Sequence, residues 1–418
     1  MKKLQPSKDN TFCPYPFSEL TLKEWIDGKL QRTSPCCMMF NSNNPGIQFP
    51  LLKNKTPEEI FNSNEFTKLR KDLLKGKKNK LCNVCWKLEE NNQTSFRLFS
   101  SPMSLEEIEK PSLNTIDLTL SNICNLRCRM CDISSSNRLA IDYGVLEKQG
   151  TREELYEITK SYRHLWPKSN AKDSIQFKWL LENTDKITTL KASGGEPFYD
   201  KSIIALLQKY IDNGDAKNTV LHFHTNATMI DDRIIDIIKH FKLNEHTFSI
   251  DGTDRVYEYI RHEADWKKLN ENIQKYLQLD NVDTINLNMV VSAHNIHNVF
   301  DYIEWAESYG ISSIIFSEVY PATRGIHLNN LPKSLLRPIY QKLDKNTYNV
   351  PQQHIDQLKE FLLVAMSTKM DPYKQQQLYR ETVILDQARN QSYRDYLYPS
   401  IVKYLDHLEK MYLTYKSK

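Results

Sequence analysis

The stretch that decides the fold is Ser121-Asn122-Ile123-Cys124-Asn125-Leu126-Arg127-Cys128-Arg129-Met130-Cys131-Asp132, which spaces three cysteines as C-x3-C-x2-C. It directly follows an apolar, β-branched run, Thr115–Leu120, that predicts a β-strand. Iron–sulfur clusters are normally held by four cysteines. Three cysteines in one short loop therefore predict a cluster with one iron left free to bind another ligand.

The overall composition limits the classes of protein to which this chain can belong. At 418 residues it is long for one average domain, which predicts two or three folding units. A net charge of +4, from 56 basic and 52 acidic residues, is too small to indicate a nucleic-acid partner. The N-terminus leads into no apolar signal segment and no apolar run reaches bilayer length, so we expect a cytoplasmic protein with no membrane partner. In that compartment, eight cysteines favour metal or catalytic roles over disulfides.

More than half of the cysteines precede residue 91. They are Cys13, Cys36, Cys37, Cys82 and Cys85. The last two form a C-x2-C turn, a spacing that places two thiolates on one metal in zinc and iron–sulfur sites alike. A strand-like segment, Leu20–Trp25, is followed by the turn signal Asp27-Gly28 and then by Pro35. This order predicts a β-hairpin with cysteine near each end.

From Asn114 to Pro321 the chain alternates strand-like and helix-like segments, which predicts βα units on a parallel sheet. The six expected strands lie near Thr115–Leu120, Ile187–Ala192, Thr219–Thr225, Thr247–Ile250, Thr284–Val291 and Ser313–Val319. From Arg324 onward the pattern is helical and polar. We therefore expect an α/β core followed by a helical region.

Polar and glycine-rich motifs follow most of the predicted strands, where binding residues of parallel βα folds lie. They are Ser193-Gly194-Gly195-Glu196-Pro197, His224-Thr225-Asn226-Ala227-Thr228, Ser249-Ile250-Asp251-Gly252 and Ser317-Glu318-Val319-Tyr320-Pro321. Arg261 comes twelve residues after Ser249, and its guanidinium is a natural bidentate partner for a carboxylate. His222 and His224 share one strand face, either as a proton relay or as hydrogen-bonded core residues.

These motifs, in this order, resemble the radical SAM superfamily, whose core is a (β/α)6 partial TIM barrel. The resemblance implies that Cys124, Cys128 and Cys131 hold a catalytic [4Fe-4S] cluster whose open iron binds S-adenosyl-L-methionine (SAM). The SAM contacts that it implies are Met130, Gly194, Gly195, Glu196, Thr225, Asn226, Ser249, Asp251, Arg261 and Val319. Two positions depart from the family: Ala227 replaces the glycine of a T-N-G-T motif, and Met130 stands where an aromatic residue is frequent.

The N-terminal cysteines resemble the twitch module, the short relative of the SPASM domain, which holds one auxiliary [4Fe-4S] cluster. The resemblance assigns this cluster to Cys13, Cys82, Cys85 and one of Cys36 and Cys37, the other being spare. Cys36 is favoured because it follows Pro35, although both remain open. The long gap from the turn glycine and the position before the core differ from the usual pattern. A structural zinc site with four cysteine ligands is the alternative.

The expected organisation is a twitch or SPASM-like module over 1–110, a radical SAM core over 111–325 and a C-terminal helical region over 326–418. The resemblance implies reductive cleavage of SAM to a 5′-deoxyadenosyl radical, which abstracts hydrogen from a peptide, protein or small molecule. An oxidation or crosslink is the expected outcome, with the auxiliary cluster accepting an electron or binding substrate. The expected partner is an electron donor such as flavodoxin or ferredoxin. The alternative is a zinc-containing nucleic-acid-binding protein with a catalytically inactive barrel.

Overall fold

The computed structural model describes residues 3–26, 29–41, 54–91, 93–149, 171–282, 285–320 and 324–416. Contacts divide the chain into two compact units, each drawn from separate segments. The first unit comprises Met1–Asn122, Pro167–Phe223 and Asp236–Asn244, and the second comprises Ile123–Trp166, His224–Ile235 and Glu245–Lys418. The three-part organisation with boundaries near residues 110 and 325 stays a prediction. Within the described residues, no helix is long and apolar enough to cross a membrane.

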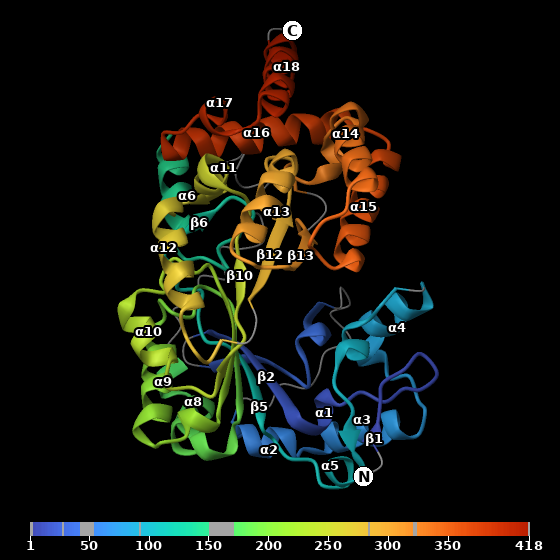
Figure 1. Ribbon diagram of the computed structural model, residues 1–418, viewed down its shortest axis with the longest axis vertical. Helices are drawn as coiled ribbons and strands as arrows, with labels where there is room; N and C mark the ends of the chain where they lie inside the picture. The colour runs from blue at the N-terminus through green and yellow to red at the C-terminus, as the bar shows by residue number, and fades with distance from the viewer. Residues whose placement is uncertain are drawn as a thin grey trace. The chain divides into compact units, whose positions relative to one another are not determined.

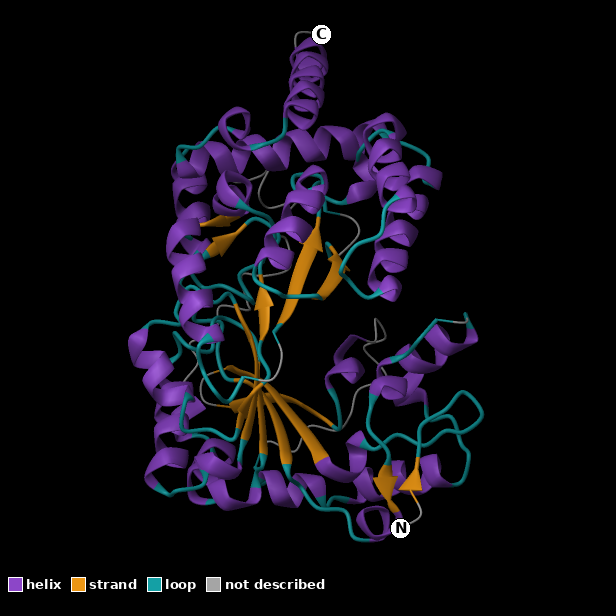
Figure 2. Cartoon of the chain, in the orientation of Figure 1, coloured by secondary structure: helices purple, strands orange, loops and turns teal. Residues whose placement is uncertain are grey.

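The sheet of the first unit has the strand order β3-β2-β5-β7-β8. Its strands are β2 (Glu19–Ile26), β3 (Lys29–Ser34), β5 (Thr115–Thr119), β7 (Thr189–Ala192) and β8 (Val220–Thr225), the last ending in the second unit. Figure 2 shows these strands side by side. β2, β5, β7 and β8 are parallel, and β3 returns antiparallel to β2. The predicted hairpin is therefore present, and its first strand extends the parallel sheet.

Alternation along these strands separates an apolar face from a polar one. The apolar side chains are fully or almost fully buried; they are Leu20, Leu22, Ile116, Leu118, Leu190, Ala192, Leu221 and Phe223. Helices α8 (Ile175–Glu182), α9 (Lys201–Asp212) and α10 (Asp232–Ile238) connect the later strands. α9 begins after Asp200, whose carboxylate accepts a hydrogen bond from Ser202 N, and it buries one apolar stripe.

Shorter elements complete the first unit. They are β1 (Lys3–Leu4), α1 (Tyr15–Ser18), α2 (Pro57–Phe61), α3 (Asn64–Leu74), α4 (Asn83–Glu90), β4 (Met103–Ser104), α5 (Leu105–Glu109) and β9 (Leu243–Asn244). Thr56 and Ser104 each form a capping box that starts the next helix. The C-x2-C turn lies at the start of α4.

In the second unit, the end of β8 pairs in parallel with β10 (Thr247–Ser249), which is followed by β12 (Asn286–Val291) and β13 (Ser313–Glu318). The connecting helices are α11 (Asp254–Ile260), α12 (Trp266–Leu277) and α13 (Val299–Ser308). A separate antiparallel pair joins β6 (Arg127–Cys128) to β11 (Arg261–His262). This pair ties the cysteine loop to the end of α11.

All six predicted strands are present as β5, β7, β8, β10, β12 and β13, each paired in parallel with the next. The predicted α/β fold with a mostly parallel sheet is confirmed, and it is consistent with a (β/α)6 partial barrel. Asp27, Gly28, Thr284 and Pro321, which belonged to predicted turns or strands, lie outside the described residues.

Helix α6 (Leu139–Lys148) follows the cysteine loop of the second unit. The unit ends in five further helices, which are α14 (Lys333–Lys345), α15 (Gln352–Ser367), α16 (Pro372–Arg389), α17 (Tyr393–Tyr396) and α18 (Pro399–Lys416). Helices α14 and α15 lie side by side (Figure 1). Among the C-terminal tyrosines, Tyr393 is buried and the ring of Tyr396 stacks on Tyr259 of α11.

Candidate iron–sulfur and cofactor sites

The C-x3-C-x2-C loop gathers its cysteines in one small apolar cluster. Cys124 and Cys128 are buried, and Cys131 packs against them with Met130 and Ala264. A hydrogen bond between the thiols of Cys128 and Cys131 lowers the pKa of Cys128 and raises the pKa of Cys131. Soft sulfur donors are the ligands that iron–sulfur clusters take. The residues present therefore fit a cluster.

Arg261 lies beside this loop and is almost completely buried. Its Nη1 is 3.7 Å from the Sγ of Cys128, and its Nη2 is 2.6 Å from Asp251 Oδ2. Asp251 is also fixed by a 2.7 Å hydrogen bond from Val290 N, and its burial raises its pKa although Arg261 opposes the shift. Among the described residues, Arg261 Nε has no hydrogen-bond partner. A buried donor without a partner fits an external acceptor such as a carboxylate.

The turn after β8 is held by an amide and hydroxyl network with the cysteine loop. Asn226 Nδ2 donates to Asn125 Oδ1 at 2.9 Å, and Asn125 Nδ2 donates to Thr228 Oγ1 at 2.8 Å. Ala227 has φ of +61°, so the turn keeps the left-handed conformation that glycine favours. Thr225 Oγ1 accepts a hydrogen bond from Ala227 N. The substitution of glycine by alanine thus leaves the turn in place.

The remaining predicted SAM contacts are divided between the two units. Ser249 ends β10 and Val319 follows β13, both in the second unit. Gly194, Gly195 and Glu196 follow β7 in the first unit, and both glycines have positive φ. Glu196 is buried, and its Oε1 accepts a hydrogen bond from Phe198 N at 3.2 Å. That carboxylate therefore stabilises its own turn.

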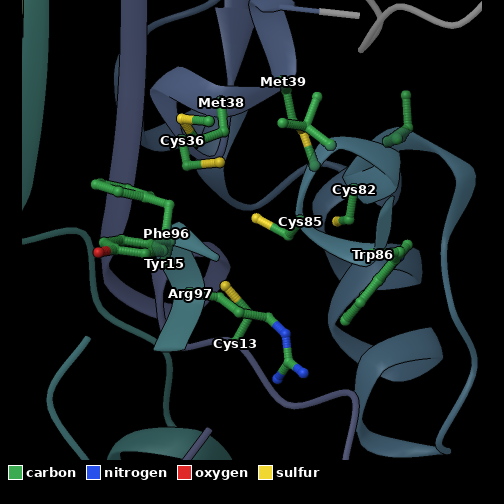
Figure 3. Close-up of a pocket in the computed structure, with 12 residues that line it drawn as sticks. Cys13, Tyr15, Cys36, Met38, Met39, Cys82, Cys85, Trp86, Phe96 and Arg97 are labelled. Atoms are coloured by element: carbon green, nitrogen blue, oxygen red, sulfur yellow. The ribbon is translucent and has the colours of Figure 1, made fainter. Parts of the chain in front are cut away.

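Four of the five N-terminal cysteines line one pocket, which Figure 3 shows from close by. They are Cys13, Cys36, Cys82 and Cys85. Tyr15, Trp86 and Arg97 line the same pocket. Burial raises the pKa of the Cys82 thiol to about 12, and neighbouring Cys85 adds to this effect.

Cys37 is not among the residues that line this pocket. Burial raises its pKa to about 11, and the charged groups that act on it most strongly are Asp117 and Lys23 of neighbouring strands. For Cys36, by contrast, the strongest electrostatic effects come from Cys13 and Cys37. The two adjacent cysteines therefore have different surroundings.

Within the described parts of the chain, no three His, Cys, Asp or Glu side chains are arranged to hold a single metal ion. Thiolates are ligands of zinc ions and of iron–sulfur clusters alike, so the cysteine side chains present fit either group.

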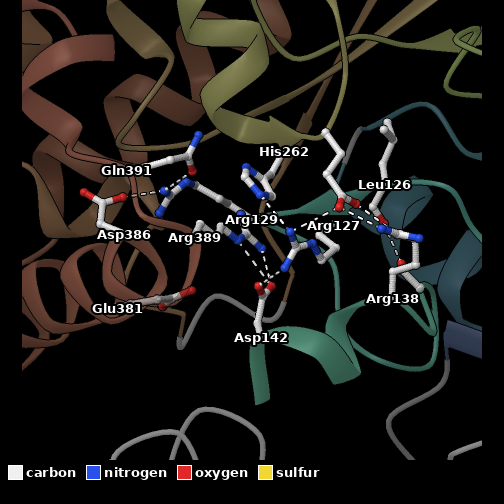
Figure 4. A network of polar contacts seen from close by, with 12 residues as sticks. Leu126, Arg127, Arg129, Arg138, Asp142, His262, Glu381, Asp386, Arg389 and Gln391 are labelled. Carbon is white, nitrogen blue, oxygen red and sulfur yellow. Dashed lines mark hydrogen bonds and ion pairs between the residues drawn. The ribbon is translucent and has the colours of Figure 1, made fainter. Parts of the chain in front are cut away.

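A buried ionic network, absent from the sequence predictions, surrounds the cysteine loop (Figure 4). Arg127 Nη1 is 2.6 Å from Asp142 of α6, and the same carboxylate pairs with Arg389 of α16 at 2.8 Å. Arg129 pairs with Asp386 of α16 and lies over the ring of Tyr259. The sequence signal was the pair of arginines on either side of Cys128, since guanidinium groups that become buried require acidic partners.

Arg324 joins the same loop to α16 by a second route. Its Nη2 donates to the carbonyl of Arg129 at 2.8 Å and its Nη1 donates to the carbonyl of Met130 at 3.2 Å. Its guanidinium also pairs with Glu381, and Nε lies 2.9 Å from that carboxylate. Helix α16 therefore supplies Glu381, Asp386 and Arg389 as structural partners of the loop.

Comparisons with known proteins find similarity in the part of the chain that contains the C-x3-C-x2-C loop. Residues 118–306 match the sequence model of the family described as "Radical SAM superfamily". An uncharacterized protein of Methanocaldococcus jannaschii is 24% identical over 218 residues, which cover 51% of this chain and 65% of that protein. GTP 3′,8-cyclase of Syntrophomonas wolfei is 24% identical over 212 residues, covering 50% of this chain and 56% of the cyclase. The chain thus matches less than two thirds of the length of each of these curated relatives.

Solved structures show weaker similarity. The structure titled "Native anSMEcpe with bound AdoMet" has a TM-score of 0.38 and 13% identity, covering 62% of this chain and 64% of that one. Streptococcus suis SuiB bound to the precursor peptide SuiA has a TM-score of 0.37 and 12% identity, covering 63% and 58%. The similarity to the radical SAM superfamily thus lies in residues 118–306 of the chain.

Proposed function

We propose that this chain is a radical SAM enzyme with two [4Fe-4S] clusters. The observation that carries the proposal is the cysteine loop beside Arg261. Cys124, Cys128 and Cys131 lie in one apolar cluster, and the buried guanidinium next to Cys128 has a donor, Nε, without a partner among the described residues. That donor fits the SAM carboxylate, because guanidinium and carboxylate form strong charge-assisted hydrogen bonds.

Other residues of the second unit would complete the SAM contacts. Asp251 fixes the orientation of Arg261, and Asn125 fixes Asn226. Met130 packs on the cysteine cluster, where its polarisable side chain suits contact with a purine. Thr225, Ser249 and Val319 stay proposed contacts, as do Gly194, Gly195 and Glu196 for the SAM ammonium group.

For the auxiliary cluster we propose Cys13, Cys36, Cys82 and Cys85 as ligands. Their common pocket supports this set, and the different surroundings of Cys37 support leaving it out. The alternative remains a zinc-containing nucleic-acid-binding protein with an inactive barrel, and iron analysis distinguishes the two.

The cluster held by Cys124, Cys128 and Cys131 would supply the electron that cleaves SAM to a 5′-deoxyadenosyl radical. The auxiliary cluster would accept an electron from the substrate. Such a radical would take one hydrogen atom from the substrate to give 5′-deoxyadenosine, and the loss of one further electron and one proton would complete a two-electron oxidation. Flavodoxin or ferredoxin is the proposed source of the first electron. The protein residues bind SAM and hold the loop away from water.

The proposal is tested by reductive cleavage of SAM. Anaerobically reconstituted wild-type protein with SAM and dithionite should release 5′-deoxyadenosine, and the triple variant Cys124→Ala, Cys128→Ala, Cys131→Ala should release none. Arg261→Met should weaken SAM binding by about tenfold or more, since it removes a charge-assisted pair. Arg394→Met, which removes an exposed arginine paired with Glu409, is the matched control. Product formation by the triple variant would contradict the assignment.

A further inference from the structure

One face of the sheet in the first unit is lined by polar and charged side chains. They are Glu19, Thr21, Lys23, Asp117, Thr119, Lys191, Ser193 and His222. The strand register places four of them in one row across the sheet, in the order Thr21, Asp117, Lys191 and His222. We call this set the polar face. The sequence signal was the alternation of charged residues with aliphatic ones along each strand.

The charges of the polar face balance. Lys191 Nζ lies 2.7 Å from Glu19 Oε2, and Lys23 Nζ lies 3.3 Å from Asp117 Oδ2. His222 adds no charge near neutral pH, because burial, and then Lys191, lower its pKa. Two ammonium groups and two carboxylates therefore give a polar surface with no net charge.

The polar face retains capacity for a ligand. The side chains of Lys23 and Lys191 are 20% and 25% exposed, whereas those of Asp117 and Glu19 are buried. Thr21 Oγ1 is completely buried and has no hydrogen-bond partner among the described residues. Buried hydroxyl groups are normally paired, so an unpaired one in a row of charged groups points to a missing polar partner.

The polar face lies close to the proposed SAM-binding loop at Gly194 and to the auxiliary cysteine pocket, both in the same unit. Lys23 Nζ lies 3.5 Å from the hydroxyl of Ser193, which directly precedes Gly194 of the proposed SAM-binding loop. Lys191 Nζ lies 5.6 Å from the ring centre of Tyr15, and Tyr15 also lines the auxiliary cysteine pocket. A ligand on this face would lie between the glycine-rich loop and that pocket.

We propose that the polar face binds the substrate, and that the substrate is a peptide or amino acid and not a nucleoside polyphosphate. The inference rests on the proposed function. A polyphosphate would bring several negative charges to lysines that are already neutralised, beside two carboxylates that cannot move into water. Amide or zwitterionic groups offer a donor for each carboxylate and an acceptor for each lysine, and they leave the charge balance unchanged.

Binding to full-length, reconstituted protein with SAM can be measured by saturation-transfer NMR. The probes are free amino acids as zwitterions, N-acetyl amino acid amides as peptide groups, and GTP as a polyphosphate. We expect that free amino acids or N-acetyl amino acid amides bind and that GTP does not. The double variant Glu19→Gln, Lys191→Gln should lower that affinity by at least about tenfold. The control Glu58→Gln, Lys186→Gln, an exposed pair of the same unit, should leave it unchanged.

The inference is overturned if only GTP binds, if no amino acid or amide binds, or if the Glu19, Lys191 double variant binds as wild type does. Thr21→Val provides a second test that leaves both ion pairs intact and removes one hydroxyl group; unchanged binding in this variant would also count against the proposal. SAM cleavage by the wild-type protein is measured separately. Cleavage without amino-acid binding would reject the inference alone, whereas no iron and no cleavage would reject the proposed function.

Discussion

Gly194 has no space for a side chain. A Cβ at this position would lie 2.2 Å from Thr119 Cγ2, and φ is +78°. The left-handed backbone alone costs an alanine about 1–2 kcal/mol, and overpacking costs about 1–3 kcal/mol more. We therefore predict that Gly194→Ala lowers the free energy of unfolding by about 2–5 kcal/mol, measured by urea denaturation.

Gly214 is the matched control, because its φ is +77° and nothing lies within 4 Å of a Cβ there. Gly214→Ala should cost only the backbone term, about 1–2 kcal/mol. Thr119→Ala combined with Gly194→Ala removes the contacting methyl group and should recover part of the loss. Equal destabilisation by Gly194→Ala and Gly214→Ala would show that the contact with Thr119 adds nothing to the loss of stability.

His294 predicts a pH dependence of stability. It is buried and its Nε2 lies 2.8 Å from Thr382 Oγ1; burial, followed by Arg129 and Arg324, holds its pKa well below the usual value. The unfolded chain binds this proton near pH 6.5 and the folded chain does not. Stability is therefore lost as pH falls below about 6.5, by up to about 1.4 kcal/mol per pH unit for this residue.

His294→Gln should flatten this dependence between about pH 7.5 and pH 5.5, as followed by urea unfolding at several pH values. His240→Gln, which changes an exposed histidine, serves as the control. A slope in His294→Gln equal to that of the wild type would show that other groups cause the loss.

At the scale of the element, helix α16 is the part whose role the sequence did not indicate. Its carboxylates Glu381 and Asp386 hold Arg324 and Arg129, which in turn hold the cysteine loop. Removing one partner of a buried ion pair typically costs about 3–5 kcal/mol. An exposed pair is worth about 0–1 kcal/mol.

We predict that Asp386→Asn and Glu381→Gln each destabilise the protein by about 3–5 kcal/mol. They should also alter the electron paramagnetic resonance spectrum of the reduced core cluster, because the loop that holds its ligands loses its support. Glu409→Gln, from the exposed pair with Arg394, should change neither the stability by more than about 1 kcal/mol nor the spectrum. Destabilisation with an unchanged spectrum would limit α16 to a role in folding.

Strands could be predicted from the sequence because a period of two residues and β-branched side chains are local signals. β5, β8 and β13 lie within two residues of their expected bounds. The pairing of Arg129 with Asp386 could not be predicted in this way, since it joins residues 257 positions apart. Motifs after strands predicted the candidate SAM residues, but they did not indicate which acids would fix the arginines.

At the scale of the whole molecule, the proposed clusters predict a metal content. Reconstituted wild-type protein should contain about eight irons per chain, and the triple variant of the core cysteines about four. Cys36→Ala should also retain about four, whereas Cys37→Ala should keep about eight, as measured by iron analysis. Loss of iron from Cys37→Ala with none from Cys36→Ala would make Cys37, and not Cys36, the ligand of the auxiliary cluster. Zinc without iron in the wild-type protein would reject both clusters.

The parallel pairing of β2 with β5 has a consequence for engineering this chain. Deletion of residues 1–40 would remove β2 and leave one edge of β5 with unpaired N–H and C=O groups, which promote aggregation. A chimera that exchanged the cysteine-bearing N-terminus for that of another protein would have to bring a strand matching β5 in register. The N-terminal segment and the core sheet therefore form one structural piece and are not exchangeable parts.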